Sequence, residues 1–179
     1  LAPATPPITP PPEPLPDKTT VEPAPPASPH HKKTPIRIAE KPAEWPALSG
    51  SRWSTISSPK ELKLVFHYGT FTKGIELSSN ARQDLKAIAA KLKGKPFRIE
   101  IEGHTDSTKA SKAKSYGNDN MAIGLARAKT VASYLTGSCG LPASMVSTSS
   151  AGDTNPPYPN TTALNQQKNR TVILKITSQ

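Results

Sequence analysis

The 179-residue sequence contains a single cysteine, Cys139, so no disulfide can form within the chain. It has no apolar run approaching the roughly 18–20 residues of a transmembrane helix. Zinc-ligand spacing and the aromatic strand motif of RNA-binding domains are also missing. No nucleophile stands in a pattern that provides it with a base, and no carboxylate pair is evident. We therefore predict a non-enzymatic protein with no catalytic residues, no metal site and no cofactor.

Proline is scarce after residue 50 and abundant before it, since 15 of the 21 prolines lie in residues 1–50. Proline fixes φ and lacks an amide donor, so neither helix nor sheet propagates through such a segment. We predict a disordered or polyproline-II arm that reaches on the order of 150 Å when fully extended. The chain is thus divided into a Pro-rich tether, residues 1–50, and a folded domain, residues 51–179. A disordered tail of no particular reach is the alternative for the arm.

The formal net charge of +10 lies entirely on the domain, because residues 1–50 contain five basic and five acidic groups. A basic domain can bind nucleic acid by releasing counterions from phosphates. Here the cations are scattered and no recognition motif accompanies them. We expect no nucleic-acid partner and a basic surface that faces some other polyanion, of which a bacterial envelope supplies several.

Hydrophobic patterns in the domain predict strands that alternate with two helices. Apolar or alternating runs predict strands at residues 61–67, 97–102, 145–151 and 171–176. Helical spacing predicts helices at residues 80–93 and 119–136, the first capped by Ser78 or Ser79 and ended by Gly94. This order is typical of an α/β or α+β sandwich in which helices cover one face of a sheet.

Three short motifs then occur in order. The sequence Gly-His-Thr-Asp occupies residues 103–106, directly after an alternating strand. The pattern N-x-x-I-x-x-x-R-A runs from Asn120 to Ala128, and Asn169-Arg170 precedes the final strand. Together these motifs resemble the OmpA-like C-terminal, peptidoglycan-binding domain family, as in peptidoglycan-associated lipoproteins, over about residues 60–179.

The resemblance implies an α+β fold of β-α-β-α-β type, with a mixed sheet and helices packed on one face. It also implies that Asp106 and Arg127 hold the diaminopimelate of the peptidoglycan stem peptide. The free end of diaminopimelate carries an ammonium and a carboxylate, which a fixed anion and a planar arginine fork suit well. The supporting candidates are Thr105, Asn120, Asn169 and Arg170.

The expected role is a cell-wall anchor in the periplasm, associated with the outer membrane through a lipid-bearing cysteine upstream of Leu1. The alternative is a structural lipoprotein subunit of an envelope-spanning secretion machine of the type IV, Dot/Icm-like kind, with a weak or unused pocket. At the site itself, a simple surface ion pair between Asp106 and Arg127 is the alternative to ligand binding. Asn169 and Arg170 have the alternative role of fixing the last strand.

The sequence departs from the family pattern at three places. Thirteen residues, 107–119, separate Asp106 from Asn120, and lysines make this insertion basic. Gly124 replaces a small polar residue and is expected to weaken the helix beside the pocket. Thr171 replaces the second arginine of the closing motif. We expect these departures to affect the pocket more than the fold.

Overall fold

The computed structural model of the protein describes residues 44–108 and 119–179. The Pro-rich arm up to residue 43 and residues 109–118 of the insertion lie outside the described residues. Among the helices that are described, none has the length and apolar character needed to cross a membrane.

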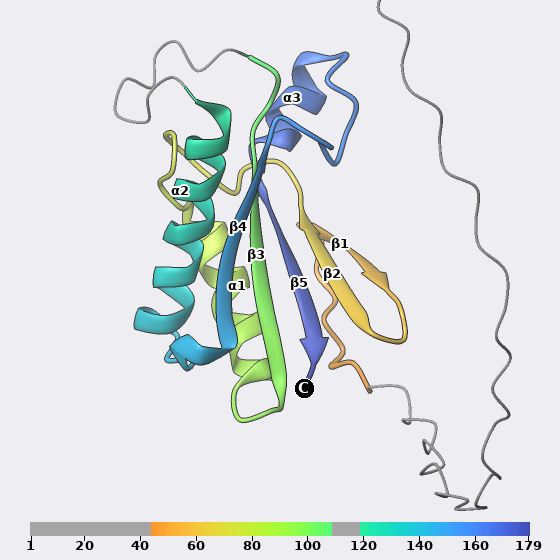
Figure 1. Ribbon diagram of the computed structural model, residues 1–179, viewed down its shortest axis with the longest axis vertical. Coiled ribbons are helices and arrows are strands. Elements are labelled where there is room, and N and C mark those ends of the chain that lie inside the picture. The colour runs from red at the N-terminus through yellow and green to blue at the C-terminus, as the bar shows by residue number, and fades with distance from the viewer. Residues whose placement is uncertain (1–43, 109–118) are drawn as a thin grey trace, which may run out of the picture. The chain divides into compact units, whose positions relative to one another are not determined.

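One mixed sheet of five strands organises the domain (Figure 1). Its order is β1-β2-β5-β3-β4, and every neighbouring pair is antiparallel except β3 and β4, which run parallel. The strands are β1 Trp53–Ser57, β2 Glu61–Phe66, β3 Phe97–His104, β4 Val146–Gly152 and β5 Val172–Ser178. Helices α1 (Ser79–Leu92) and α2 (Asn120–Ser133) cover one face, while the short α3 (Ala163–Asn169) lies beyond one end of the sheet (Figure 1). The predicted α+β class, with a mixed sheet and helices on one face, is confirmed.

Alternation along the strands creates the core. Side chains of β2, β3 and β5 that point toward the helices are apolar and almost fully buried, and those that point away are mostly charged. The core combines these strand residues with the inner faces of both helices; its largest members are Leu62, Leu64, Phe66, Leu85, Ile88, Leu92, Ile99, Ile101, Leu135, Leu174 and Ile176.

Local chemistry sets the helix ends. The Ser78 hydroxyl accepts a hydrogen bond from the Ala81 amide at 3.1 Å, and Gly94 has φ 73° just after α1, as the cap signals predict. The second helix ends as an α-helix at Ser133 and continues as a π-helical turn, Tyr134–Ser138, rather than running on to residue 136. Strand β1 and helix α3 were not predicted from the sequence.

Packing of the folded unit includes residues that precede the domain boundary expected at residue 51. The Trp45 ring stacks on Phe97 with centroids 5.7 Å apart, and its Nε1–H donates to the Ser58 carbonyl at 2.9 Å. Leu48 is 6% exposed and belongs to the core. Residues 44–50 therefore contribute to the folded unit.

Candidate functional site

The GHTD motif lies where several elements end or begin. Strand β3 finishes at His104, whose amide donates to the Thr171 carbonyl just before β5 at 3.0 Å. The Thr105 amide donates to the carbonyl of Gly152, the last residue of β4, at 2.7 Å. Asp106 is therefore held at the end of the sheet where α2 also starts.

A close contact between two glycines sets the position of α2. A Cβ at Gly103 of β3 would overlap the Gly124 carbonyl of α2, and a Cβ at Gly124 would lie 2.8 Å from the Gly103 carbonyl oxygen. The Ser150 hydroxyl of β4 fills the adjacent space and donates to the Met121 carbonyl at 2.8 Å. The expectation that Gly124 weakens the helix beside the pocket stays a prediction, but the structure gives this glycine a packing role that the sequence did not indicate. Its missing side chain is what allows α2 to approach the sheet so closely.

Arg127 extends from α2 into this junction and is 6% exposed. Its Nε–H donates to the Gly74 carbonyl at 3.0 Å and its Nη1 to the His104 carbonyl at 2.7 Å, while its Cζ lies 5.3 Å from the centre of the Phe71 ring. Burial lowers the pKa of Arg127 to about 10, although the charge of Asp106 raises it. The guanidinium remains a cation at neutral pH. Within the described residues, its Nη2 amino group donates no hydrogen bond.

Asp106 is 5% exposed and pairs with Arg170 rather than with Arg127. One carboxylate oxygen accepts from Arg170 Nε at 2.6 Å, and the other accepts from the Thr108 amide at 3.1 Å. Asp106 and Arg127 interact through their charges, and no ion pair between them is present among the described residues. The alternative of a simple Asp106–Arg127 surface pair is therefore not what the fold forms.

The supporting candidates take different positions. The Thr105 hydroxyl is buried and has no hydrogen-bond partner in the described part of the chain. Asn120 at the start of α2 donates to the carbonyls of Asp106 and Thr108, both at 3.4 Å. The Asn169 amide instead bonds both backbone groups of Tyr158 and the side chain of Asn160, so it supports the loop before α3.

Thr171, the third departure from the family pattern, is fully buried. Its hydroxyl donates to the Phe66 carbonyl at 2.8 Å and lies 3.4 Å from the Thr70 hydroxyl. It therefore links the end of β2 to the start of β5.

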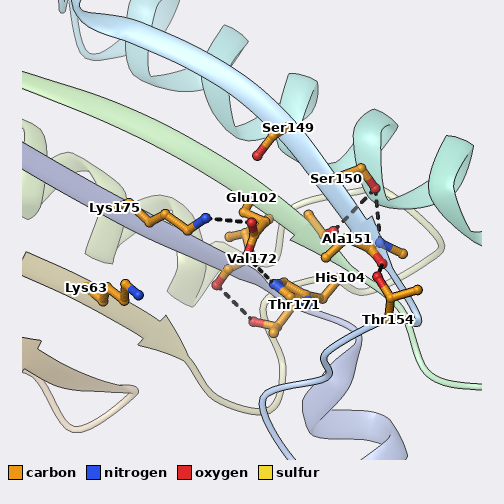
Figure 2. Close-up of polar contacts among 12 residues, drawn as sticks. Lys63, Glu102, His104, Ser149, Ser150, Ala151, Thr154, Thr171, Val172 and Lys175 are labelled. Carbon is orange, nitrogen blue, oxygen red and sulfur yellow. Dashed lines mark hydrogen bonds and ion pairs between the residues drawn. The ribbon is translucent and has the colours of Figure 1, made fainter. Parts of the chain in front are cut away.

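The imidazole of His104 belongs to a separate polar network on the open face of the sheet (Figure 2). Its Nε2 lies 3.0 Å from a Glu102 oxygen, and the other Glu102 oxygen accepts from Lys175 at 2.6 Å. Burial lowers the pKa of His104, against the charge and hydrogen bond of Glu102, which raise it. Only the backbone carbonyl of His104 reaches Arg127.

Comparison with known proteins agrees with this arrangement. The sequence pattern of the OmpA family matches residues 70–170, more than half of the chain. The chain belongs to the OmpA family. No curated protein sequence gives a significant match that would add to this assignment.

Solved structures show how widely this OmpA-family fold is shared. The periplasmic domain of Helicobacter pylori MotB (its residues 90–256) superposes with a TM-score of 0.63 at 22% identity, covering 74% of this chain and 83% of that one. The cell wall anchor of the T6SS from Pseudomonas aeruginosa gives a TM-score of 0.63 at 21% identity, covering 72% and 89%. A putative MotB-like protein from Desulfovibrio vulgaris gives 0.63 at 23% identity, covering 71% and 82%. At these identities the likeness establishes the fold.

The motifs in the sequence indicated Asp106, Arg127 and Arg170, and the fold brings all three together. They gave no indication of Phe71 and Gly74, which contact Arg127 from the loop between β2 and α1. Gly74 acts through its carbonyl, a group that every residue carries, so the sequence gives no sign of the contact. Its φ of 55° explains only why glycine occupies the turn.

Proposed function

We propose that this OmpA-family domain is a non-enzymatic anchor that binds the diaminopimelate-containing stem peptide of peptidoglycan. The observation that supports this most is the state of Arg127. Its cation is buried and held by backbone carbonyls, and no carboxylate of the described residues bonds to it. A buried charge without a bonded counterion is costly, and a ligand carboxylate on Nη2 would relieve that cost.

The neighbouring groups suit the rest of a zwitterionic ligand. Asp106 is held at the same junction and offers an anion for an ammonium group. Its carboxylate accepts one hydrogen bond on each oxygen, and each oxygen has a further lone pair. The unpartnered Thr105 hydroxyl adds a third polar group. With Arg170, the cluster carries one negative and two positive charges, which favours a ligand with an extra carboxylate.

A binding role fits these residues better than catalysis. The His104 imidazole, which would be the obvious base, is tied to Glu102 and lies in the network on the open sheet face. No hydrogen bond joins this imidazole to Asp106 or Arg127 among the described residues. Asn120 braces the loop that carries Asp106, and Asn169 braces the loop before α3, so both support the site without contacting a reacting group.

A domain that binds peptidoglycan would act where the cell wall lies, which bears on its location and its partners. The Pseudomonas aeruginosa relative of similar fold is described as a cell wall anchor of the T6SS. We infer a periplasmic location in the cell envelope, with an outer-membrane link through a lipidated N-terminus. The second candidate is a lipoprotein subunit of an envelope-spanning machine of the type IV, Dot/Icm-like kind. Co-purification of a stable complex by variants that no longer bind the wall would favour that candidate.

Co-sedimentation with isolated diaminopimelate-type sacculi tests the binding function. Asp106→Asn removes the anion and Arg127→Gln removes the cation, and both variants keep a polar side chain at the position. Each should weaken binding by about 2–5 kcal/mol, because it leaves one half of the zwitterion unpaired. Lys129→Gln is the matched control, since Lys129 is an exposed cation two residues along the same helix. Both site variants sedimenting like the wild type, with unchanged urea midpoints, would refute the assignment.

A further inference from the structure

The loop of residues 70–78, between β2 and α1, is a small braced turn with Gly74 at its tip. An antiparallel bridge pairs Phe71 with Leu77. Three backbone hydrogen bonds of 2.9–3.0 Å also close the loop; the amides of Thr72, Glu76 and Ser78 donate to the carbonyls of Glu76, Lys73 and Thr70, respectively. Because its own backbone bonds hold its shape, the loop can act as a fixed surface for other groups.

Arg127 lies on that surface. The Phe71 ring covers the guanidinium at 5.3 Å, and the Gly74 carbonyl accepts its Nε–H at 3.0 Å. The His104 carbonyl fixes Nη1 from the other side at 2.7 Å. Three groups from two elements therefore determine both the tilt and the in-plane rotation of the guanidinium, and Nη2 is the amino group left without a partner in the described residues.

We propose that Phe71 is a positioning residue of the peptidoglycan site, which together with the Gly74 carbonyl orients Arg127 so that Nη2 faces the ligand carboxylate. This inference rests on the proposed function. The ring contributes in two ways that an aliphatic side chain does not. Its face attracts the cation electrostatically, and its flat surface limits the rotamers of a long side chain.

The effect on binding follows from the size of such contacts. A cation–π contact of this kind corresponds to about a 3- to 30-fold change in affinity when it is lost from a partly desolvated site. Phe71 is only partly buried, so its replacement leaves most of the core untouched. Leucine keeps an apolar side chain there but removes the aromatic face, and tyrosine retains that face.

The experiment measures the affinity of the full chain for a soluble muropeptide with a diaminopimelate-terminated stem, by calorimetry. We expect Phe71→Leu to bind about 3- to 30-fold more weakly and Phe71→Tyr to bind within about twofold of wild type. Phe71→Met is the second non-aromatic variant if the leucine variant folds poorly. In the ligand-free protein, the Arg127 Nε–H resonance should carry a ring-current shift in wild type and Phe71→Tyr. That shift should disappear in Phe71→Leu.

The outcomes separate this inference from the function it rests on. No binding by the wild-type chain would refute the proposed function, and the positioning role with it. Wild-type binding that is unchanged in Phe71→Leu would overturn the positioning role alone. Weaker binding with an unmoved Arg127 Nε–H resonance would overturn it too, because the ring would then act without orienting the guanidinium.

Discussion

Gly124 of α2 lies directly against Gly103 of β3, with no room for a side chain on either residue. This contact places the first half of α2 deeper against the sheet than an alanine would allow. Arg127 follows Gly124 by three residues, so the depth of the helix also determines how far its guanidinium reaches toward Asp106. The glycine pair thus connects packing to the geometry around Asp106 and Arg127, the site proposed to bind peptidoglycan.

We expect Gly124→Ala to destabilise the domain by about 1–3 kcal/mol, because an added Cβ would press on the Gly103 carbonyl and the Ser150 hydroxyl. Helix propensity alone predicts the opposite sign, a gain of about 1 kcal/mol. Urea unfolding measures the difference. Gly137→Ala is the control, since nothing lies within 4 Å of a Cβ there, and it should be neutral or slightly stabilising. A Gly124→Ala variant as stable as that control would contradict the packing argument.

Truncation of Leu48 tests whether residues 44–50 contribute to the folded unit. Leu48→Ala should cost about 2–4 kcal/mol, as expected for a leucine that is 6% exposed. Leu164→Ala removes the same atoms from a side chain that is 56% exposed and should change stability by less than about 0.5 kcal/mol. Equal urea midpoints for the two variants would show that residue 48 is outside the cooperative unit.

Acidification should destabilise the domain in two stages. Burial lowers the pKa of His104, so the unfolded chain binds a proton more readily and stability falls once the pH drops below about 6.5. Burial raises the pKa of Glu102, but the hydrogen bond and charge of Lys175, with His104, outweigh this and leave the pKa below its ordinary value. Its contribution is lost below about pH 4.5.

Urea midpoints measured from pH 8 down to about pH 3 would show both stages. His104→Gln keeps a donor for Glu102 but does not titrate, so the decline that starts near pH 6.5 should be smaller in this variant. The lower stage should remain. Wild-type stability that rises between pH 6.5 and pH 5 would contradict the assignment to His104.

The Asp106–Arg170 pair should couple energetically even without ligand. Arg170 is about half exposed and Asp106 is buried, with 49% and 7% of their side chains accessible, so solvent screens only one partner. A double-mutant cycle with Asp106→Asn and Arg170→Gln should give a coupling of about 1 kcal/mol in urea unfolding. A coupling near zero would mean that Arg170 contributes nothing to holding Asp106.

Local signals in the sequence were sufficient for most of the elements. Ser78 and Gly94 define the ends of α1 through cap chemistry that involves only nearby residues, and alternation along residues 97–102 defines β3. Strand β1 was missed because four of its five residues are exposed, so burial leaves no period-two pattern. Its identity as a strand depends on pairing with β2, a contact that no local pattern reports. Helix α3 was also missed, because it is short and polar and has no apolar stripe that a helical pattern could reveal.

The site was partly accessible to the same reasoning. The motifs indicated Asp106 and Arg127 as candidates, and the fold brings their charges close enough to interact. The groups that hold Asp106 and Arg127 in place could not be predicted from the sequence. Arg170 reaches Asp106 across 64 residues, and Arg127 is held by carbonyls whose side chains are irrelevant to the contact. The packing role of Gly124 was not predicted, because helix propensity is a local property whereas the close contact is with a neighbouring strand.

The stacking of Trp45 on Phe97 has a mechanical consequence. Phe97 begins β3, which extends about 23 Å to His104 at ~3.3 Å per residue, and Asp106 lies two residues beyond the end of that strand. A pull on the chain ahead of Trp45, resisted by a ligand held at Asp106, would load β3 along its length. Its hydrogen bonds to β5 on one side and β4 on the other would then be sheared together, because neither neighbour can peel away one pair at a time. Strand β3, which is hydrogen-bonded to a neighbour on each side, is thus also placed to bear tension.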